Sequence, residues 1–194
     1  VLNPILNKKK LPPVNKALTI KTELSETIIF LNEFLSTAGL PLIASDISEE
    51  ALKQLVFSSE TKLNWRAYLS HYDHEDSFHL ALRVDSGENI PDGAVLGIYN
   101  VKNGVLNIYL LESLVIQEQE HPLRGRLTAL MIVAVSYFLS YFENSQGILL
   151  CEPSPDLEDY YKSFGFEYIS DDEMFASIER LNDMQTRLNE AIGS

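Results

Sequence analysis

The chain has a single cysteine, Cys151, few cations and no apolar run of membrane-spanning length. One cysteine excludes an intramolecular disulfide, and no Cys/His spacing is typical of a zinc site. The longest apolar stretch, 127–142, is interrupted by threonine and serine and is shorter than the roughly 18–20 residues of a membrane span. No apolar signal-peptide segment occurs near the first residue. We therefore expect a cytoplasmic protein in a reducing compartment, with no metal and no membrane partner.

Cations are scarce, with 15 Lys and Arg against 28 Asp and Glu in 194 residues and a formal net charge of −13. Phosphate backbones attract clustered Lys and Arg, so nucleic acid is not an expected partner. Several of the cations fall near the first residues, among prolines. We predict a flexible basic extension over residues 1–17 and a single domain over 18–194.

The spacing of apolar residues predicts two helices first, one from Ser25 to Gly39 and one after Asp46. Three strands follow, at 78–84, 94–101 and 105–116. The second and third are joined by an Asn-Gly pair, which suits a tight hairpin turn. The third strand is almost continuously apolar, which indicates a place at the centre of a sheet.

A β-α-β crossover is the next predicted feature. A helix over 125–142 joins the long strand to a short one at Ile148–Cys151, so the two strands should be parallel and the crossover right-handed. A helix at 155–163 and a strand at 167–169 follow. Residues 174–192 fit either one helical stripe or a strand at 174–178 with a C-terminal helix at about 179–192, and we favour the second. The predicted fold class is α/β (α+β), a mixed central sheet flanked by helices.

A basic loop precedes the long helix, where Arg124, Gly125 and Arg126 follow the buried strand. The first turn of a helix has unpaired N–H groups and a partial positive charge, so anions bind there. Glycine lets an anion approach the backbone, and two guanidinium groups add charge. The alternative is that both arginines pair with neighbouring carboxylates such as Glu118 and Glu120.

Two segments resemble the GNAT superfamily of acetyl-CoA-dependent N-acetyltransferases. Residues 124–129 are similar to its R/Q-x-x-G-x-G/A loop, matching at Arg124 and Ala129 and departing at Leu127, where the family usually has glycine. Residues 157–166 are similar to its A-x-x-x-Y-x-x-x-G-F segment, with Tyr161 on the family tyrosine. Leucine at 127 is expected to narrow the approach of the backbone to a phosphate.

The resemblance implies a GNAT-like fold with an acyl-CoA-binding crossover, acetyl-CoA as co-substrate, and direct transfer of the acetyl group to an amine. It implies that Tyr161 protonates the departing CoA thiolate, and the alternative is a packing tyrosine. The implied cofactor-binding residues are Leu114, Val115, Ile116, Arg124, Gly125, Arg126, Leu127, Thr128, Ala129 and Ser154.

Glu112 is a charged residue within the most apolar predicted strand. Such a group is costly unless it is paired or lines a cleft, so we predict a general base, with an edge-facing carboxylate as the alternative. His79 and His121 are weaker candidates. The polar stretch 71–76 is predicted to be a solvated loop or a rim of the acceptor site.

The function predicted from the sequence is acetyl transfer from acetyl-CoA to a small-molecule or peptide amine. The acidic charge favours a cationic acceptor and disfavours acetylation of charged tRNA. The alternative function is a degenerate GNAT-like domain that acts as a non-catalytic binding or assembly module. A homodimer through the C-terminal helix is an alternative to docking of that helix on its own sheet.

Overall fold

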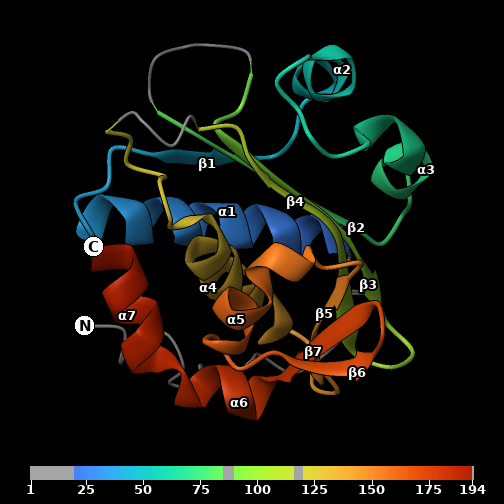
Figure 1. Ribbon diagram of the computed structural model, residues 1–194, viewed down its shortest axis with the longest axis vertical. Coiled ribbons are helices and arrows are strands. Elements are labelled where there is room, and N and C mark those ends of the chain that lie inside the picture. The colour runs from blue at the N-terminus through green and yellow to red at the C-terminus, as the bar shows by residue number, and fades with distance from the viewer. Residues whose placement is uncertain (1–19, 85–89, 116–119, 194) are drawn as a thin grey trace.

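The computed structural model describes residues 20–84, 90–115 and 120–193 (Figure 1). The predicted extension at 1–17 and the candidate Ile116 lie outside these ranges. The strands form a seven-stranded sheet of order β1-β2-β3-β4-β5-β7-β6. They are β1 Ile43–Ser45, β2 Ser77–Arg83, β3 Gly93–Asn100, β4 Val105–Ser113, β5 Gly147–Cys151, β6 Glu167–Ser170 and β7 Glu173–Ser177.

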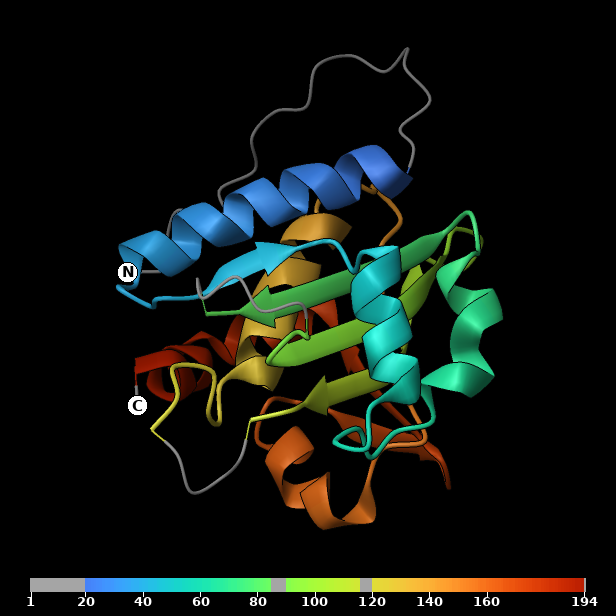
Figure 2. The ribbon, with the colours of Figure 1, turned by 90° about the horizontal axis from the view of Figure 1, so that it is seen from above.

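Helices cover the sheet on both faces and follow its last strand. They are α1 Ile20–Thr37, α2 Glu49–Phe57, η1 Trp65–Tyr68, α3 Leu69–Tyr72, α4 Leu127–Leu139, η2 Pro155–Leu157, α5 Glu158–Lys162, α6 Ile178–Asp183 and α7 Gln185–Gly193. Figure 2 shows α1 running alongside β1, with α2 crossing over the strands. Among the described residues, no helix is both long and apolar enough to cross a membrane.

The sheet is mixed, as predicted. β1 to β4 pair antiparallel in chain order, and β4 then pairs parallel with β5 through the α4 crossover. β7 adds antiparallel to β5, and β6 forms the far edge. The predicted fold class, a mixed sheet with a β-α-β crossover and flanking helices, is therefore confirmed.

The core divides into two clusters, one on each face of the sheet. The face under α1 and α4 holds the larger cluster, with side chains such as Leu31, Phe78 and Phe138 fully buried. The face under α2 and η1 holds the smaller one, around Leu55 and Trp65. Burying each large apolar side chain contributes about 1.5–3 kcal/mol, so both faces fix the helices to the strands.

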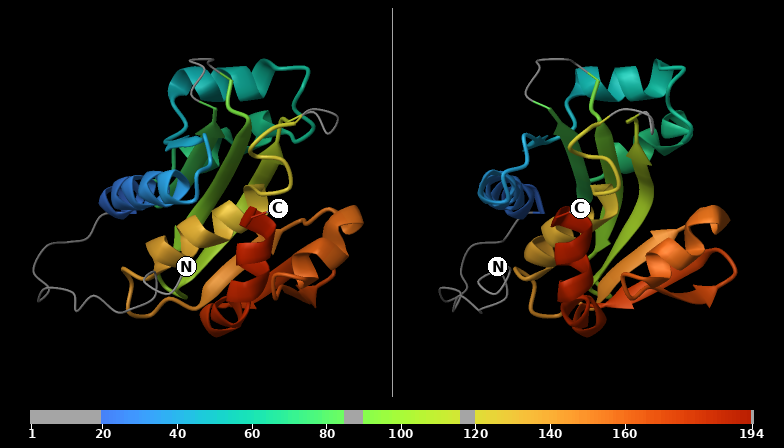
Figure 3. Two further views of the ribbon diagram at one scale, coloured as in Figure 1. Left: turned by 90° about the vertical axis from the view of Figure 1, so that its left-hand side faces the viewer. Right: turned by 60° about the vertical axis from the view of Figure 1, so that its left-hand side comes forward.

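The parallel pair β4/β5 is short, and its strands then diverge (Figure 3). Pairing runs from Val105 opposite Gly147 to Ile108 opposite Leu150, while β4 continues to Ser113. The β3–β4 register shifts next to this point, because Gly97 pairs with Ile108 but Leu96 pairs with Leu110. Tyr109 is therefore the extra residue of a β-bulge. We call the region beyond Ile108 and Leu150, where the two strands separate, the strand fork.

Several elements differ from the sequence prediction. β1 was not predicted. It forms an edge strand because the Asn32 side chain on α1 bonds both the N–H and the carbonyl of Ala44. The N-cap of α2 is Ser48 rather than Asp46, since the Ser48 hydroxyl accepts from the Ala51 amide. The C-terminal helix is broken at Met184 into α6 and α7.

Candidate functional site

The N-terminus of α4 lies at the end of the loop that follows β4. Leu127, Thr128 and Ala129 make up its first turn, and Arg126 is an N-cap without a side-chain cap hydrogen bond. The first amides of a helix have no intrahelical acceptor, so this turn presents donors and a partial positive charge. Gly125 has φ 71°, in the left-handed region, which explains glycine at this position.

Leu127 points into the core instead of covering the loop. It is 7% exposed, and its side chain packs with that of Leu123 over Gly93 on β3. A Cβ placed on Gly93 would lie 2.6 Å from a Leu123 methyl and 3.0 Å from a Leu127 methyl. The bulk of Leu127 is therefore accommodated by the absence of a side chain at Gly93. In this packing the Leu127 side chain does not narrow the path of a phosphate to the backbone, although the sequence had led us to expect that it would.

A second contact holds the same loop to the sheet. The Leu123 amide donates to His121 Nδ1 at 3.1 Å, and His121 Nε2 lies 3.4 Å from Asp92 Oδ1. Asp92 in turn accepts from the Val84 amide through its side chain and from the Leu114 amide through its carbonyl. Asp92 and His121 thus fix the loop before α4 relative to β2 and β4.

The two arginines of the loop have different environments. The Arg126 guanidinium donates to the carbonyls of Ile192 at 2.8 Å and Pro122 at 2.9 Å, which ties the end of α7 to the loop. Arg124 is exposed, and its side chain has no hydrogen bond or ion pair to any described residue, although its backbone amide donates to the His121 carbonyl. Arg126 therefore has two of its guanidinium N–H groups engaged within the protein, and anion binding by both guanidinium groups stays a prediction.

A cavity of about 580 Å³ opens at this loop. Its walls are formed by Glu120, His121, Pro122, Arg124, Gly125 and Arg126. Arg124 is the cation there without a protein partner, and Glu120 is the opposing carboxylate. An unpaired guanidinium and an exposed glycine backbone are groups that suit a phosphate, whereas Leu127, Thr128 and Ala129 of the first turn of α4 are buried and are not part of this lining. Within the described ranges, no three His, Cys, Asp or Glu side chains gather as metal ligands would.

The remaining predicted binding residues lie along the end of β4 and beyond β5. The Leu114 amide is bonded to the Asp92 carbonyl at 2.8 Å, so this N–H is not available to a ligand. Val115 is half-buried and packs against the larger core cluster. Ser154 is exposed and directly precedes η2, with no capping hydrogen bond from its side chain.

The sequence matches no family profile and no curated protein. Solved structures with a similar fold include the "Spermidine N-acetyltransferase SpeG K23-Q34 chimera from Vibrio cholerae and hSSAT", with 14% identity and a TM-score of 0.51 over 74% of this chain and 99% of that one. Another is an uncharacterized Bacillus halodurans protein, with 8% identity and a TM-score of 0.53 over 78% and 91% of the two chains. The chain has the GNAT fold.

Two adjacent tyrosines of α5 have different environments. Tyr161 is buried in the core, whereas Tyr160 contacts the loop before α4. Tyr161 is 6% exposed and packs edge-on against Phe166 at 6.3 Å between ring centroids. Burial, with a smaller effect of Tyr160, raises the pKa of Tyr161 to about 12. Its hydroxyl is therefore protonated at neutral pH, which suits a donor. The Tyr160 hydroxyl donates to the Gly125 carbonyl at 3.1 Å, a contact that the sequence did not indicate.

Glu112, predicted as a general base, is fully engaged within the GNAT fold. It is 5% exposed. Its Oε1 accepts from the amides of Lys62 at 2.5 Å and Leu63 at 3.3 Å, and its Oε2 accepts from Trp65 Nε1 at 2.7 Å. Both carboxylate oxygens are therefore held by N–H donors of the protein. The geometry favours an anchor for the segment before η1 over a base, and it also contradicts the edge-facing alternative.

Proposed function

We propose that this protein transfers an acetyl group from acetyl-CoA to an amine acceptor. The observation that carries the proposal is the position of the α4 N-terminus at the end of the strand fork, with Arg124 unpaired at the cavity. In this arrangement the first-turn amides of α4 and Arg124 would hold the diphosphate of CoA. The separated edges of β4 and β5 would receive the pantetheine arm.

Within this proposal Tyr161 is the group that donates a hydrogen bond or proton to the departing thiolate. A phenol with a pKa of about 12 is a much weaker acid than a thiol, whose ordinary pKa is about 8.5. Complete transfer of the phenolic proton to the sulfur is therefore unfavourable even after the C–S bond has broken, so the hydroxyl would donate a hydrogen bond to the sulfur or pass on the proton that leaves the attacking nitrogen. Tyr161 would act late, when negative charge has accumulated on the sulfur.

The acceptor in this proposal is a small-molecule or peptide amine that carries a positive charge in solution. The net charge of −13 supports a cation, because an acidic surface raises the local concentration of cationic substrates. One solved structure with this fold is described as a spermidine N-acetyltransferase, but at 14% identity the likeness supports only the fold. The acceptor class therefore rests on the chain's own charge.

The first test is binding of acetyl-CoA, measured by thermal shift and calorimetry. A ligand at about 100 times its Kd adds about 2.7 kcal/mol of stability, which corresponds to a Tm rise of about 5–10 °C for a chain of this size. Arg124→Glu should weaken binding by roughly 10–100-fold, because it replaces a charge-assisted donor with a like charge. Lys102→Glu, the same charge change in the exposed turn after β3, is the matched control.

The second test separates catalysis from binding. Tyr161→Phe should lower the rate of CoA release by roughly 100-fold or more with unchanged affinity for acetyl-CoA. Tyr168→Phe, on the exposed strand β6, should change neither quantity. Acetyl-CoA that binds without any turnover would favour the non-catalytic binding module. Absence of both heat and Tm shift would contradict acetyl-CoA as a ligand.

A further inference from the structure

An aromatic cluster lies at the strand fork on the face opposite Tyr161. Tyr109, the bulged residue of β4, contacts the ring of His71 edge-on at 4.5 Å and the ring of Tyr68 at 5.8 Å between centroids. Tyr68 and His71 are themselves 5.0 Å apart. The three rings come from β4, η1 and α3. Residues 71–76, predicted to be a solvated loop or an acceptor rim, therefore begin with a histidine placed beside the fork.

The end of β5 brings negative charge to the same cluster. Burial raises the pKa of Tyr68, and the charge of Glu152 raises it further. Glu152 has φ 51°, a left-handed conformation that costs a non-glycine residue about 1 kcal/mol or more. Its amide donates to the Asp172 carbonyl at 2.8 Å, which holds this turn in place. Aromatic faces with one carboxylate form an environment that attracts an ammonium group.

Transfer to an ammonium acceptor requires a group that removes its proton, and the other candidates near the fork are unsuited. Both oxygens of Glu112 accept hydrogen bonds from the segment 62–65. Burial, with Glu173, Glu152 and Asp172, raises the pKa of Cys151 to about 11, so its thiol is protonated at neutral pH. Histidine is the side chain that can be neutral and still basic near pH 7.

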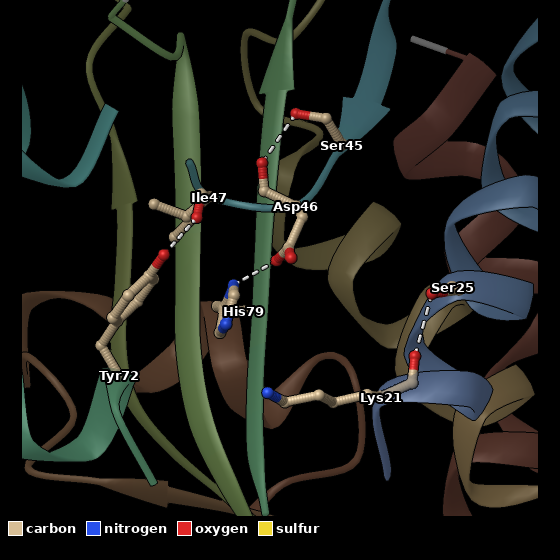
Figure 4. A network of polar contacts seen from close by, with 7 residues as sticks. All are labelled: Lys21, Ser25, Ser45, Asp46, Ile47, Tyr72 and His79. Atoms are coloured by element: carbon tan, nitrogen blue, oxygen red, sulfur yellow. Dashed lines mark hydrogen bonds and ion pairs between the residues drawn. The ribbon is translucent and has the colours of Figure 1, made fainter. Parts of the chain in front are cut away.

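Three of the four histidines are engaged elsewhere. His79 is paired with Asp46 and covered by the ring of Tyr72, whose hydroxyl donates to the Ile47 carbonyl (Figure 4). His121 is bonded to the loop before α4. His74 is exposed and accepts from the Asp76 amide through Nδ1.

The fourth histidine, His71, has a different environment. It is half-buried, and within the described residues the only polar contact of its ring is a long 3.5 Å approach of Nδ1 to the Ser70 hydroxyl. The titratable groups that face it are Tyr68 from η1 and Tyr109 from β4, with Glu152 and Cys151 beyond Tyr68. On β2, which α3 also contacts, His79 lies against Tyr72 and not against His71.

We infer that His71 is the base that takes the proton from an alkylammonium acceptor bound at Tyr68, Tyr109 and Glu152. The inference rests on the acetyl transfer proposed above. The imidazole removes one proton from the ammonium, and the freed nitrogen lone pair forms the C–N bond to the thioester carbonyl carbon. The C–S bond then breaks, and the second proton of the nitrogen reaches the CoA sulfur through the Tyr161 hydroxyl. The products are the N-alkylacetamide, CoA thiol and protonated His71.

The test compares two amines of the same shape with different basicity, ethylamine and 2,2,2-trifluoroethylamine, in an assay of CoA release. Ethylamine is protonated at pH 7.5, whereas the fluorinated amine is largely neutral and needs no base for its first proton. His71→Gln should lower kcat/KM for ethylamine by roughly 100-fold, the usual contribution of a general base. With trifluoroethylamine the loss should stay within a few-fold. In the variant only the neutral fraction of ethylamine can react, so kcat/KM should keep rising with pH instead of levelling off above neutral pH as in the wild type.

His74→Gln is the matched control, because it makes the same change three residues away on an exposed ring. This variant should have the wild-type kcat/KM for both amines and the wild-type pH profile. Equal losses for the two amines in His71→Gln would show a merely structural role and overturn the inference, as would an ethylamine profile that still levels off above neutral pH. Acetyl-CoA binding without turnover of either amine also overturns it, while failure of acetyl-CoA to bind overturns the proposed function itself.

Discussion

The two faces of the sheet are held together in different ways. Under α1 and α4 the contacts are almost entirely apolar, and the buried carboxyl there, Glu23, has an Oε2 atom without a hydrogen-bond partner. Under α2 and η1 the apolar cluster is smaller, and the buried Glu112 has both oxygens bonded. The helices on the first face are held to the sheet by apolar packing. On the second face a few polar contacts contribute as well, and losing one of them should affect only the segment that it holds.

The difference indicates how the residues on one face of the sheet can stay the same while those on the other face change. The packed face positions α4, whose N-terminus we assign to the diphosphate. The polar contacts fix the segments that carry Tyr68 and His71, which we assign to the acceptor. Substitutions in these segments can change the acceptor that they bind without repacking the larger core cluster, because only a few hydrogen bonds hold the segments in place.

The largest effect is expected from Phe138→Ala on the packed face. Phe138 is fully buried and contacts the rings of Phe78 and Tyr99, so the substitution leaves a cavity between α4 and the sheet. We expect a loss of about 3–5 kcal/mol of unfolding free energy, measured by urea denaturation. Phe57→Ala, at a position 78% exposed, should change it by less than about 0.5 kcal/mol. Similar losses for the two variants would contradict the described packing.

A smaller and more local effect is expected from Glu112→Gln. The amide cannot accept from two backbone N–H groups and an indole as the carboxylate does, so we expect a loss of about 1.5–3 kcal/mol. Trp65 is the only tryptophan and is 1% exposed, so its emission should shift to the red as its segment loosens. Glu60→Gln, on the exposed stretch before Trp65, serves as the control. Unchanged stability and emission would show that Glu112 is not an anchor.

The smallest effect is expected from Glu23→Gln, with the opposite sign. Burial, with a smaller effect of Glu26, raises the pKa of Glu23 in the folded state. The folded state therefore binds this proton more tightly than the unfolded chain, and stability is lost as pH rises through the raised pKa. The uncharged glutamine should raise Tm at pH 7.5, and its advantage should vanish below about pH 4, where the unfolded carboxyl is protonated. Glu33→Gln, exposed on α1, should show no such pH dependence.

Local patterns in the sequence were enough to predict the central strand, the crossover helix and the closing strand. Each of these depends on apolar spacing and turn residues within one segment. The roles of Glu112 and Arg126 could not be predicted, because their partners lie at Lys62 to Trp65 and at Ile192, far away in the sequence. The bulge at Tyr109 could not be predicted either, since it appears only in the register against β3.

The strand fork also has a consequence for the order of folding. β2, β3 and β4 pair with their neighbours in the chain, whereas the β4–β5 pair forms only after the whole α4 crossover has been placed. Contacts between distant parts of a chain form late, because the intervening loop must first be closed. The two sides of the fork therefore meet near the end of folding, and a partly folded chain would keep its antiparallel strands while lacking the fork that we propose for the thioester.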